Sequence, residues 1–255
     1  SQALGYCNLL RAVYVSCASQ ATIDYQAFSG SDTFQSLSIG LPPSVTFTGS
    51  PTRVSDDCGI PGARLPAIDA NGHLEIPEGT PMVPNTYYGS SALKSVHVAS
   101  TVTLIGDEAF GDCVNLANVT FAANSTLATV GAFAFKASGV VSLDIPYTTK
   151  TIMRNAFQSC ASLQSVSFRN QSQLASIGSY AFQKCGALRA FAVPDMVTQM
   201  EVYVFAYNPS LKMVTFGDAS ALTSIGNSAF SSSGLTTITV PSGVLTIGSS
   251  AFASC

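Results

Sequence analysis

Cysteine is the residue type of this chain best suited to chemistry, because thiolates bind metals, form disulfides and act as nucleophiles. Five of the seven cysteines recur at one place, three residues after a phenylalanine or its substitute in a repeating pattern: Cys7, Cys113, Cys160, Cys185 and Cys255. Other repeats hold serine or asparagine there, so the place requires a small side chain that hydrogen-bonds to the backbone. Zinc needs about four converging ligands, and such a ladder supplies one per repeat. We therefore predict structural thiols and no metal site.

Cys17 and Cys58 fall outside that ladder. If the protein is extracellular, a disulfide between them would tie down an irregular segment. Two free thiols are the alternative, and the sequence leaves both open.

The histidines, His73 and His97, lie near Glu75 in the repeat register. His97 and Glu75 occupy the same outward position on adjacent repeats, so we expect their side chains to be neighbours. A histidine–carboxylate pair can act as an acid–base couple or as half a metal site. No nucleophile stands at a matching position, and we favour two surface residues that satisfy each other.

Other chemical signatures are missing from the sequence. It has no glycine-rich phosphate loop, no catalytic triad signature and no acidic cluster of the kind that calcium requires. We predict that the chain is not an enzyme and uses no cofactor.

An internal repeat must position these residues. Its marker is an Ala-Phe pair whose phenylalanines are spaced by 25, 22, 25, 23, 25 and 22 residues from Phe110 onward, Val-Phe replacing Ala-Phe once. Five residues before each phenylalanine stands an aliphatic side chain. A period near 23 residues that never drifts indicates a stacked solenoid.

The strands of this solenoid follow from a second pattern. Apolar residues stand six, nine and eleven places after the marker, and the last two alternate as in a strand with one buried face. We predict an α/β solenoid, a leucine-rich repeat array with a parallel sheet of about ten short strands on one face and irregular or short helical return segments on the other. The expected strands are 13–15, 37–39, 74–76, 96–98, 119–121, 143–145, 166–168, 191–193, 214–216 and 238–240.

The whole chain, 1–255, is predicted to form this single array, with an irregular insertion at about 40–64 that is rich in proline and glycine. From the expected strand 119–121 onward, a proline directly follows every second strand, as at Pro146 and Pro194, whereas the intervening repeats carry two extra residues there. We therefore expect tight turns and protruding loops to alternate along one edge. Both ends of the sequence fall inside a repeat, so we interpret the chain as a piece of a longer protein and expect end-to-end or neighbour contacts at its uncapped ends.

The string Ile105-Gly106, Ala109-Phe110, Cys113, Leu116 and Val119-Thr120-Phe121, with its copy that begins at Ile177-Gly178, resembles the BspA-like, or Treponema pallidum-type, leucine-rich repeat. The resemblance covers most of the chain and weakens across roughly 40–90. It implies a curved solenoid without enzymatic activity, of a kind found on the surfaces of mucosal bacteria and protists, where it contributes to adhesion and host-protein binding. The family supplies no fixed ligand residues.

Composition excludes two classes of partner. The 11 Lys and Arg residues are scattered and the net charge is −3, so no basic stripe could neutralise the phosphates of a nucleic acid. No apolar run approaches the roughly 18–20 residues that span a bilayer, so we predict no membrane insertion in this segment.

We predict a recognition or adhesion module, extracellular or at the cell surface, that binds a protein partner through the sheet face or the protruding loops. The alternative is an intracellular, cytoplasmic structural or scaffold solenoid that bridges neighbouring proteins. Few outward positions carry the aromatic or arginine anchors of protein interfaces. The candidate binding residues are Arg11, Tyr14, Glu75, His97, Asp144, Arg169 and Arg189.

Overall fold

The computed structural model describes residues 23–24, 47–48, 66–169 and 171–255, and the chain divides into two compact units, 1–65 and 66–255. In the first unit β1 (Ile23–Asp24) and β2 (Phe47–Thr48) pair in parallel, with Ile23 opposite Phe47. Strand β2 lies within the expected insertion at about 40–64. The other predictions for this unit fall outside the described residues; they concern Cys7, Arg11, Tyr14, Cys17, Cys58 and the strands 13–15 and 37–39. A single array over 1–255 stays a prediction.

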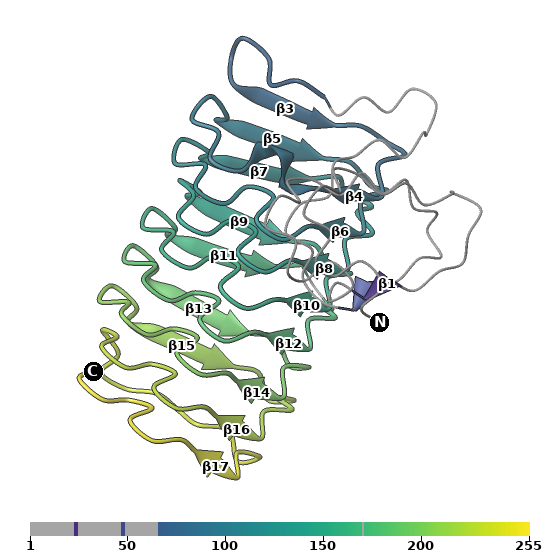
Figure 1. Cartoon of the computed structure of the whole chain (residues 1–255). Coiled ribbons are helices and arrows are strands. Elements are labelled where there is room, and N and C mark those ends of the chain that lie inside the picture. Colours follow the sequence, from purple (N-terminus) through teal and green to yellow (C-terminus); the bar gives the residue numbers. More distant parts are fainter. Residues whose placement is uncertain (1–22, 25–46, 49–65, 170) are drawn as a thin grey trace. The chain divides into compact units, whose positions relative to one another are not determined.

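The second unit is a solenoid in which each repeat makes one turn, or rung, of a flattened coil (Figure 1). Four-residue strands form its first side and pair in parallel from rung to rung, in one sheet from β3 to β11 and in another of β13 and β15. Inward apolar and outward polar side chains alternate along them, as the two-residue period requires. These strands are β3 (His73–Ile76), β5 (Ser95–Val98), β7 (Asn118–Phe121), β9 (Ser142–Ile145), β11 (Ser165–Phe168), β13 (Ala190–Val193) and β15 (Met213–Phe216). They confirm seven of the predicted strands.

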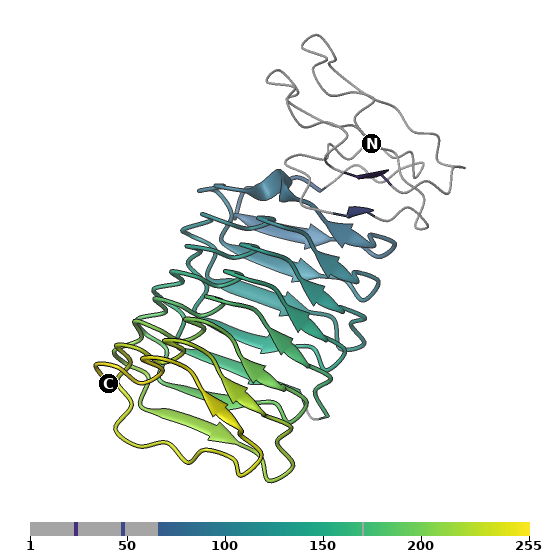
Figure 2. The same cartoon turned by 60° about the horizontal axis from the view of Figure 1, so that its bottom comes forward.

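A second row of parallel strands, two residues each, lies on another side of the coil (Figure 2) and was not predicted. In most rungs it contains the aliphatic residue that precedes the marker by five places, so the sequence held a signal for it. The members are β4 (Met82–Val83), β6 (Leu104–Ile105), β8 (Thr129–Val130), β10 (Thr151–Ile152), β12 (Ser176–Ile177), β14 (Gln199–Met200), β16 (Ser224–Ile225) and β17 (Thr246–Ile247).

Of the irregular or short helical return segments that we expected, the helical kind is wrong for the described rungs, and so is the α/β class, because these rungs form a β-solenoid whose returns are short strands and turns. Their helical structure is limited to one 3₁₀ turn at Asn85–Tyr87. The reason lies in where the backbone donors point. In the rung of Phe157, the amides of Asn155, Phe157 and Ser159 donate to carbonyls of the following rung at 2.8–3.0 Å. An α-helix would need the same amides for bonds within the segment.

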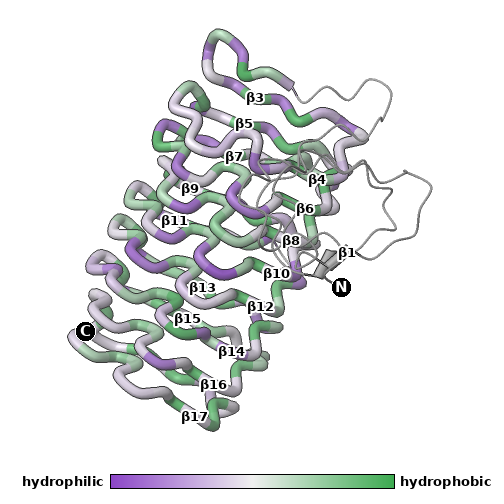
Figure 3. The backbone as a smooth tube through the Cα atoms, viewed as in Figure 1, coloured by the Kyte–Doolittle hydropathy of each residue, from purple (hydrophilic) through white to green (hydrophobic). Residues whose placement is uncertain are grey.

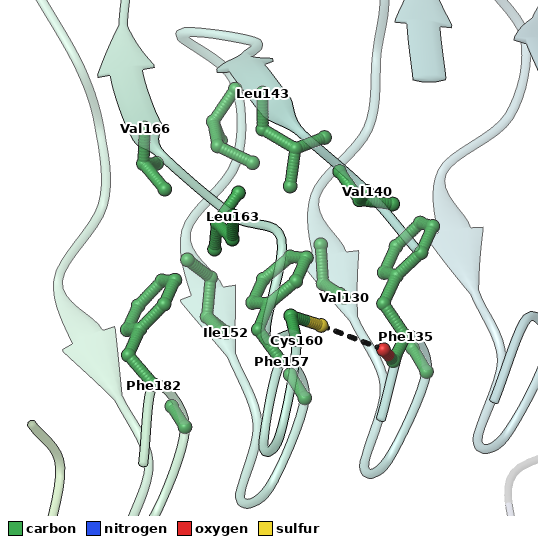
Figure 4. Packing of buried hydrophobic residues seen from close by; sticks show 14 of the residues in the cluster. Val130, Phe135, Val140, Leu143, Ile152, Phe157, Cys160, Leu163, Val166 and Phe182 are labelled. Atoms are coloured by element: carbon green, nitrogen blue, oxygen red, sulfur yellow. Dashed lines mark hydrogen bonds between the residues drawn. The ribbon is translucent and has the colours of Figure 1, made fainter. Parts of the chain in front are cut away.

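The core is a continuous column of apolar side chains, and apolar segments recur in every rung of the hydropathy view (Figure 3). Its axis is a stack of marker rings that begins at Tyr87, the expected substitute for phenylalanine, and ends at Phe252. Phe157 is fully buried, with its ring centroid 5.2 Å from those of Phe135 and Phe182 (Figure 4). Burial of one such ring is worth about 1.5–3 kcal/mol in transfer free energy alone.

The expected strand at 238–240 is also wrong, because Ile238 and Val240 remain half-buried and unpaired in the structure. A groove of about 590 Å³ separates this segment from β15. Nearby, Leu245 and Ile247 are 83% and 54% exposed.

Candidate functional site

Two surfaces of the solenoid carry the side chains that could contact a partner. The strand face consists of the outward positions of β3 through β15. The turn edge consists of the exposed positions from three residues before to two residues after the marker ring of each rung. Among the described residues no group of three or more His, Cys, Asp or Glu side chains is arranged to hold a metal ion, and no helix is long and apolar enough to cross a bilayer.

The N-terminal part of the strand face holds a polar chain across three rungs. Glu75 lies opposite His97 in the ladder, with 4.0 Å between its Oε1 and the histidine Nε2. The second carboxylate oxygen lies 3.3 Å from Nε2 of His73. The Nδ1 atoms face hydroxyl groups, Ser95 Oγ at 2.8 Å and Thr120 Oγ1 at 3.0 Å. Both imidazoles thus have polar contacts within the face itself.

Arg169 joins three rungs at the end of the strand face. Its Nε donates to Asp144 Oδ2 at 2.9 Å, and its Nη1 donates to the carbonyl oxygen of Ala123 at 3.1 Å and more weakly to that of Ala122. The rung between ends its strand at Pro146 and makes a tight turn there. The guanidinium reaches across this turn to the loop of the rung before. Asp144 and Arg169, predicted to bind a partner, therefore engage each other and the backbone.

The outward positions of β13 and β15, which include the exposed Met213, are uncharged, and the exposed cations Arg189 and Lys212 directly precede these strands. Arg189 is exposed there, next to outward Ala190 and Ala192. The structure thus brings together two pairs of the candidates, Glu75 with His97 and Asp144 with Arg169, and leaves Arg189 by itself. Arg11 and Tyr14 fall outside the described residues.

The cysteine ladder faces inward from the turn edge. Cys113, Cys160 and Cys185 are buried free thiols. Each donates to the carbonyl oxygen of the marker in the preceding rung, at 3.0–3.2 Å (Figure 4). Asn208 fills the same slot and donates to Phe182 at 2.9 Å. Desolvation raises the pKa of the Cys160 thiol to about 11 and also raises the pKa of Cys113 and Cys185, so these thiols are poor nucleophiles.

The turn edge has an unusual backbone. In each rung from Phe110 onward, the residues two before and two after the marker have positive φ, between 53° and 62°. This conformation directs their amides toward the next rung, where they donate alongside the marker amide. Left-handed φ favours glycine or asparagine and is uncommon for bulky residues. Several rungs nevertheless place an aromatic ring there: Phe133 at 58°, Tyr180 at 62°, Tyr203 at 56° and Tyr207 at 61°.

On the turn edge these rings lie beside one another or beside three cations. Tyr180 and Tyr203 stack at 5.2 Å with 9° between their planes. Lys184 Nζ lies 6.0 Å from the ring centre of Tyr207. The Phe133 ring has Arg154 at 5.3 Å and Lys136 at 5.6 Å. We did not predict this set from the sequence, although the four rings and Lys184 all stand two places before or after a marker.

Comparison with known proteins supports the repeat assignment. A family model described as BspA type leucine rich repeat region matches residues 80–212 and 128–255. Similar solved structures are a leucine-rich repeat protein from Bacteroides ovatus (21% identity, 98% of this chain and 72% of that chain, TM-score 0.58) and one from T. pallidum (22% identity, 70% and 73%, TM-score 0.52). Both likenesses show the fold.

A leucine-rich cell surface protein from Faecalibacterium prausnitzii is 32% identical over 64% of this chain, with a TM-score of 0.47, and the chain spans 37% of that protein. No curated protein matches. The family model alone covers well over half of the sequence, from residue 80 to residue 255, and its repeat is the rung described above. The chain belongs to the BspA-type leucine-rich repeat family.

Proposed function

We propose that this chain is a non-catalytic recognition module at the cell surface that contributes to adhesion by binding a protein partner. The observation that carries the proposal is where the rungs differ from one another. Inward positions hold the same few apolar residue types in nearly every rung. Exposed positions change from rung to rung, as from Glu75 to His97 to Thr120 along one row. The scaffold is thus constant, and the surface that a partner would meet is particular to each rung.

Rigidity supports the same proposal. Most inner rungs are hydrogen-bonded to their neighbours through both rows of strands, and the turn edge adds hydrogen bonds from rung to rung. A side chain on such a frame loses little freedom when a partner binds, which lowers the entropic cost of association. The cell-surface location rests on the family resemblance.

The first experiment locates the protein. On intact cells of the source organism, an antibody to the solenoid should label the chain, and added protease should remove it. Labelling only after permeabilisation would contradict the surface location. A thiol assay on unreduced, denatured protein adds to this, because a Cys17–Cys58 disulfide favours an oxidising location.

The second experiment measures binding. Purified chain should bind a protein in a panel of purified matrix and serum proteins, read by surface plasmon resonance, and binding should fall when exposed positions are exchanged between rungs. The matched control exchanges one inward valine for another rung's isoleucine. Absence of binding across the panel would contradict an adhesion role.

A further inference from the structure

We propose that the turn edge between the rungs of Phe135 and Phe205 is the docking surface for an acidic segment of the protein partner. This inference rests on the proposed function and names where and by what chemistry the partner binds. We call the residues concerned the aromatic edge: Phe133, Arg154, Tyr180, Lys184, Tyr203 and Tyr207.

The fold itself does not require these side chains. The backbone position two before the marker accepts Ser228 and Ser250 in the last rungs with the same positive φ, and the position two after accepts Ser159 and Ser232. The backbone has positive φ at these positions in each rung from Phe110 onward, whichever side chain stands there, and bulky residues are uncommon in that conformation. Large side chains that the scaffold does not need are candidates for a functional role.

Accessibility is the second argument. Tyr207 is 45% exposed, Lys184 and Arg154 are exposed, and Tyr180 and Tyr203 are half-buried. Tyrosine and arginine are the residue types that dominate the energetics of protein interfaces, since each combines a large apolar surface with hydrogen-bonding groups. The strand face offers no comparable group of rings among its described residues.

Charge along the turn edge points to the sign of the partner. Over the rungs of Phe135 to Phe182 the edge carries Lys136, Arg154 and Lys184, whereas its acidic residues gather in the preceding rung. Asp107 and Asp112 of that rung accept hydrogen bonds from the Ala132 amide and the Tyr88 hydroxyl, and their negative charge stays in that rung. The acid nearest in sequence to the tyrosines, Glu201, stands four residues before Phe205, outside the turn edge, and accepts a hydrogen bond from Ser179. The aromatic edge is thus a locally cationic surface on a chain of net charge −3.

Ring geometry distinguishes a protein segment from a sugar or a nucleic acid. Sugars and bases bind aromatic residues by lying flat on a free ring face. Tyr180 and Tyr203 stack face to face, and the Phe133 ring already has two cations within 5.6 Å of its centre. The ring faces that Tyr180 and Tyr203 turn to each other, and the face of Phe133 that the cations cover, are therefore occupied. The cations can pair with the carboxylates of an acidic, partly apolar segment.

The test uses the full chain and a short dye-labelled peptide of glutamate, phenylalanine and serine. We expect binding that weakens as salt is raised, and no binding of the same peptide with glutamine in place of glutamate. Changing Tyr180, Tyr203 and Tyr207 together to serine, the residue other rungs use, should weaken binding at least about tenfold. Lys184→Ser should reduce both the affinity and its salt dependence.

The matched control is Lys212→Gln, which removes an exposed cation directly before β15, away from the aromatic edge, and should leave binding unchanged. Thermal melting of each variant checks that it is folded. Equal binding by the triple serine variant, equal binding of the glutamine peptide, or tighter binding of single-stranded oligonucleotides or oligosaccharides would overturn the inference. If a panel protein binds the chain but only strand-face variants abolish that binding, the proposed function stands and this inference fails.

Discussion

The strand face and the turn edge are built by the same stacking of rungs, yet their exposed side chains make different kinds of contact. On the strand face, polar side chains of adjacent rungs satisfy one another, as Glu75 does with His97 and Asp144 with Arg169. On the turn edge, the residues two before and two after each marker have positive φ, and rings there stack with rings or lie beside cations. A surface whose polar groups already have contacts gains little from a partner, because each new bond replaces an existing one.

Both surfaces share one core, and the largest effect should come from there. Phe157→Ala removes a fully buried ring that stacks on two neighbours at 5.2 Å. We expect the free energy of unfolding in urea, followed by circular dichroism, to fall by about 3–5 kcal/mol. Because each rung contacts only its neighbours, unfolding should also lose cooperativity. Phe157→Leu should lower the free energy of unfolding much less. An alanine variant whose loss is as small as that of the leucine variant would contradict the central role of the ring stack.

The buried thiols behind the turn edge should make stability depend on alkaline pH. Burial raises the pKa of Cys160 to about 11 from its ordinary value of 9.0. The thiol stays protonated in the folded chain and ionises on unfolding, so its contribution is complete below pH 9 and is lost as pH rises toward 11. Roughly 2–3 kcal/mol should be lost over that range.

Cys160→Ser is the matched variant, since Ser138 and Ser233 fill the same slot in other rungs. It should keep near-normal stability at neutral pH and show a shallower decline between pH 9 and 11 in urea titrations. Parallel pH profiles for the two proteins would contradict this role of burial.

On the strand face, Arg169→Ala should have a moderate effect. It removes the bond to Asp144 and the bonds to carbonyl oxygens of the loop 121–123. Because the guanidinium is partly exposed, we expect a loss of only about 1–2 kcal/mol in unfolding free energy. Arg169→Lys should recover little, since an ammonium group cannot bond in several directions at once with the same geometry. Arg189→Ala serves as the control, and we expect it to leave the free energy of unfolding unchanged. Equal losses of unfolding free energy at the two positions would contradict a stabilising role for the contacts of Arg169.

The smallest effect on stability should come from the turn edge. Tyr203→Ser removes a half-buried ring from a left-handed position that serine occupies at Ser228. Serine adopts the same backbone conformation and the lost ring is only half-buried, so the free energy of unfolding should fall by at most about 1 kcal/mol in thermal melts. A loss above 2 kcal/mol would make the ring part of the scaffold and would weaken the contrast between the two surfaces.

The sequence determined by itself the rungs, their register and most of the core. The Phe and aliphatic positions recur at fixed spacing because every rung must bury the same cross-section, so the pattern predicts which residues stack. The inward cysteines follow the same rule, since a slot shared by Cys, Ser and Asn needs a small donor. The outward pairing of Glu75 with His97 could be expected because parallel strands in register place equivalent residues side by side.

Only the tertiary structure decided what happens between those repeated positions. The return segment became a ladder of left-handed residues instead of a helix, because its amides bond to the following rung, and a single rung read alone contains no sign of that choice. The reach of Arg169 across Pro146 and the stacking of Tyr180 on Tyr203 join residues 46 and 23 positions apart. Side-chain contacts between rungs depend on the exact turn lengths and backbone angles that the stacked array imposes, and these are properties of the assembled coil.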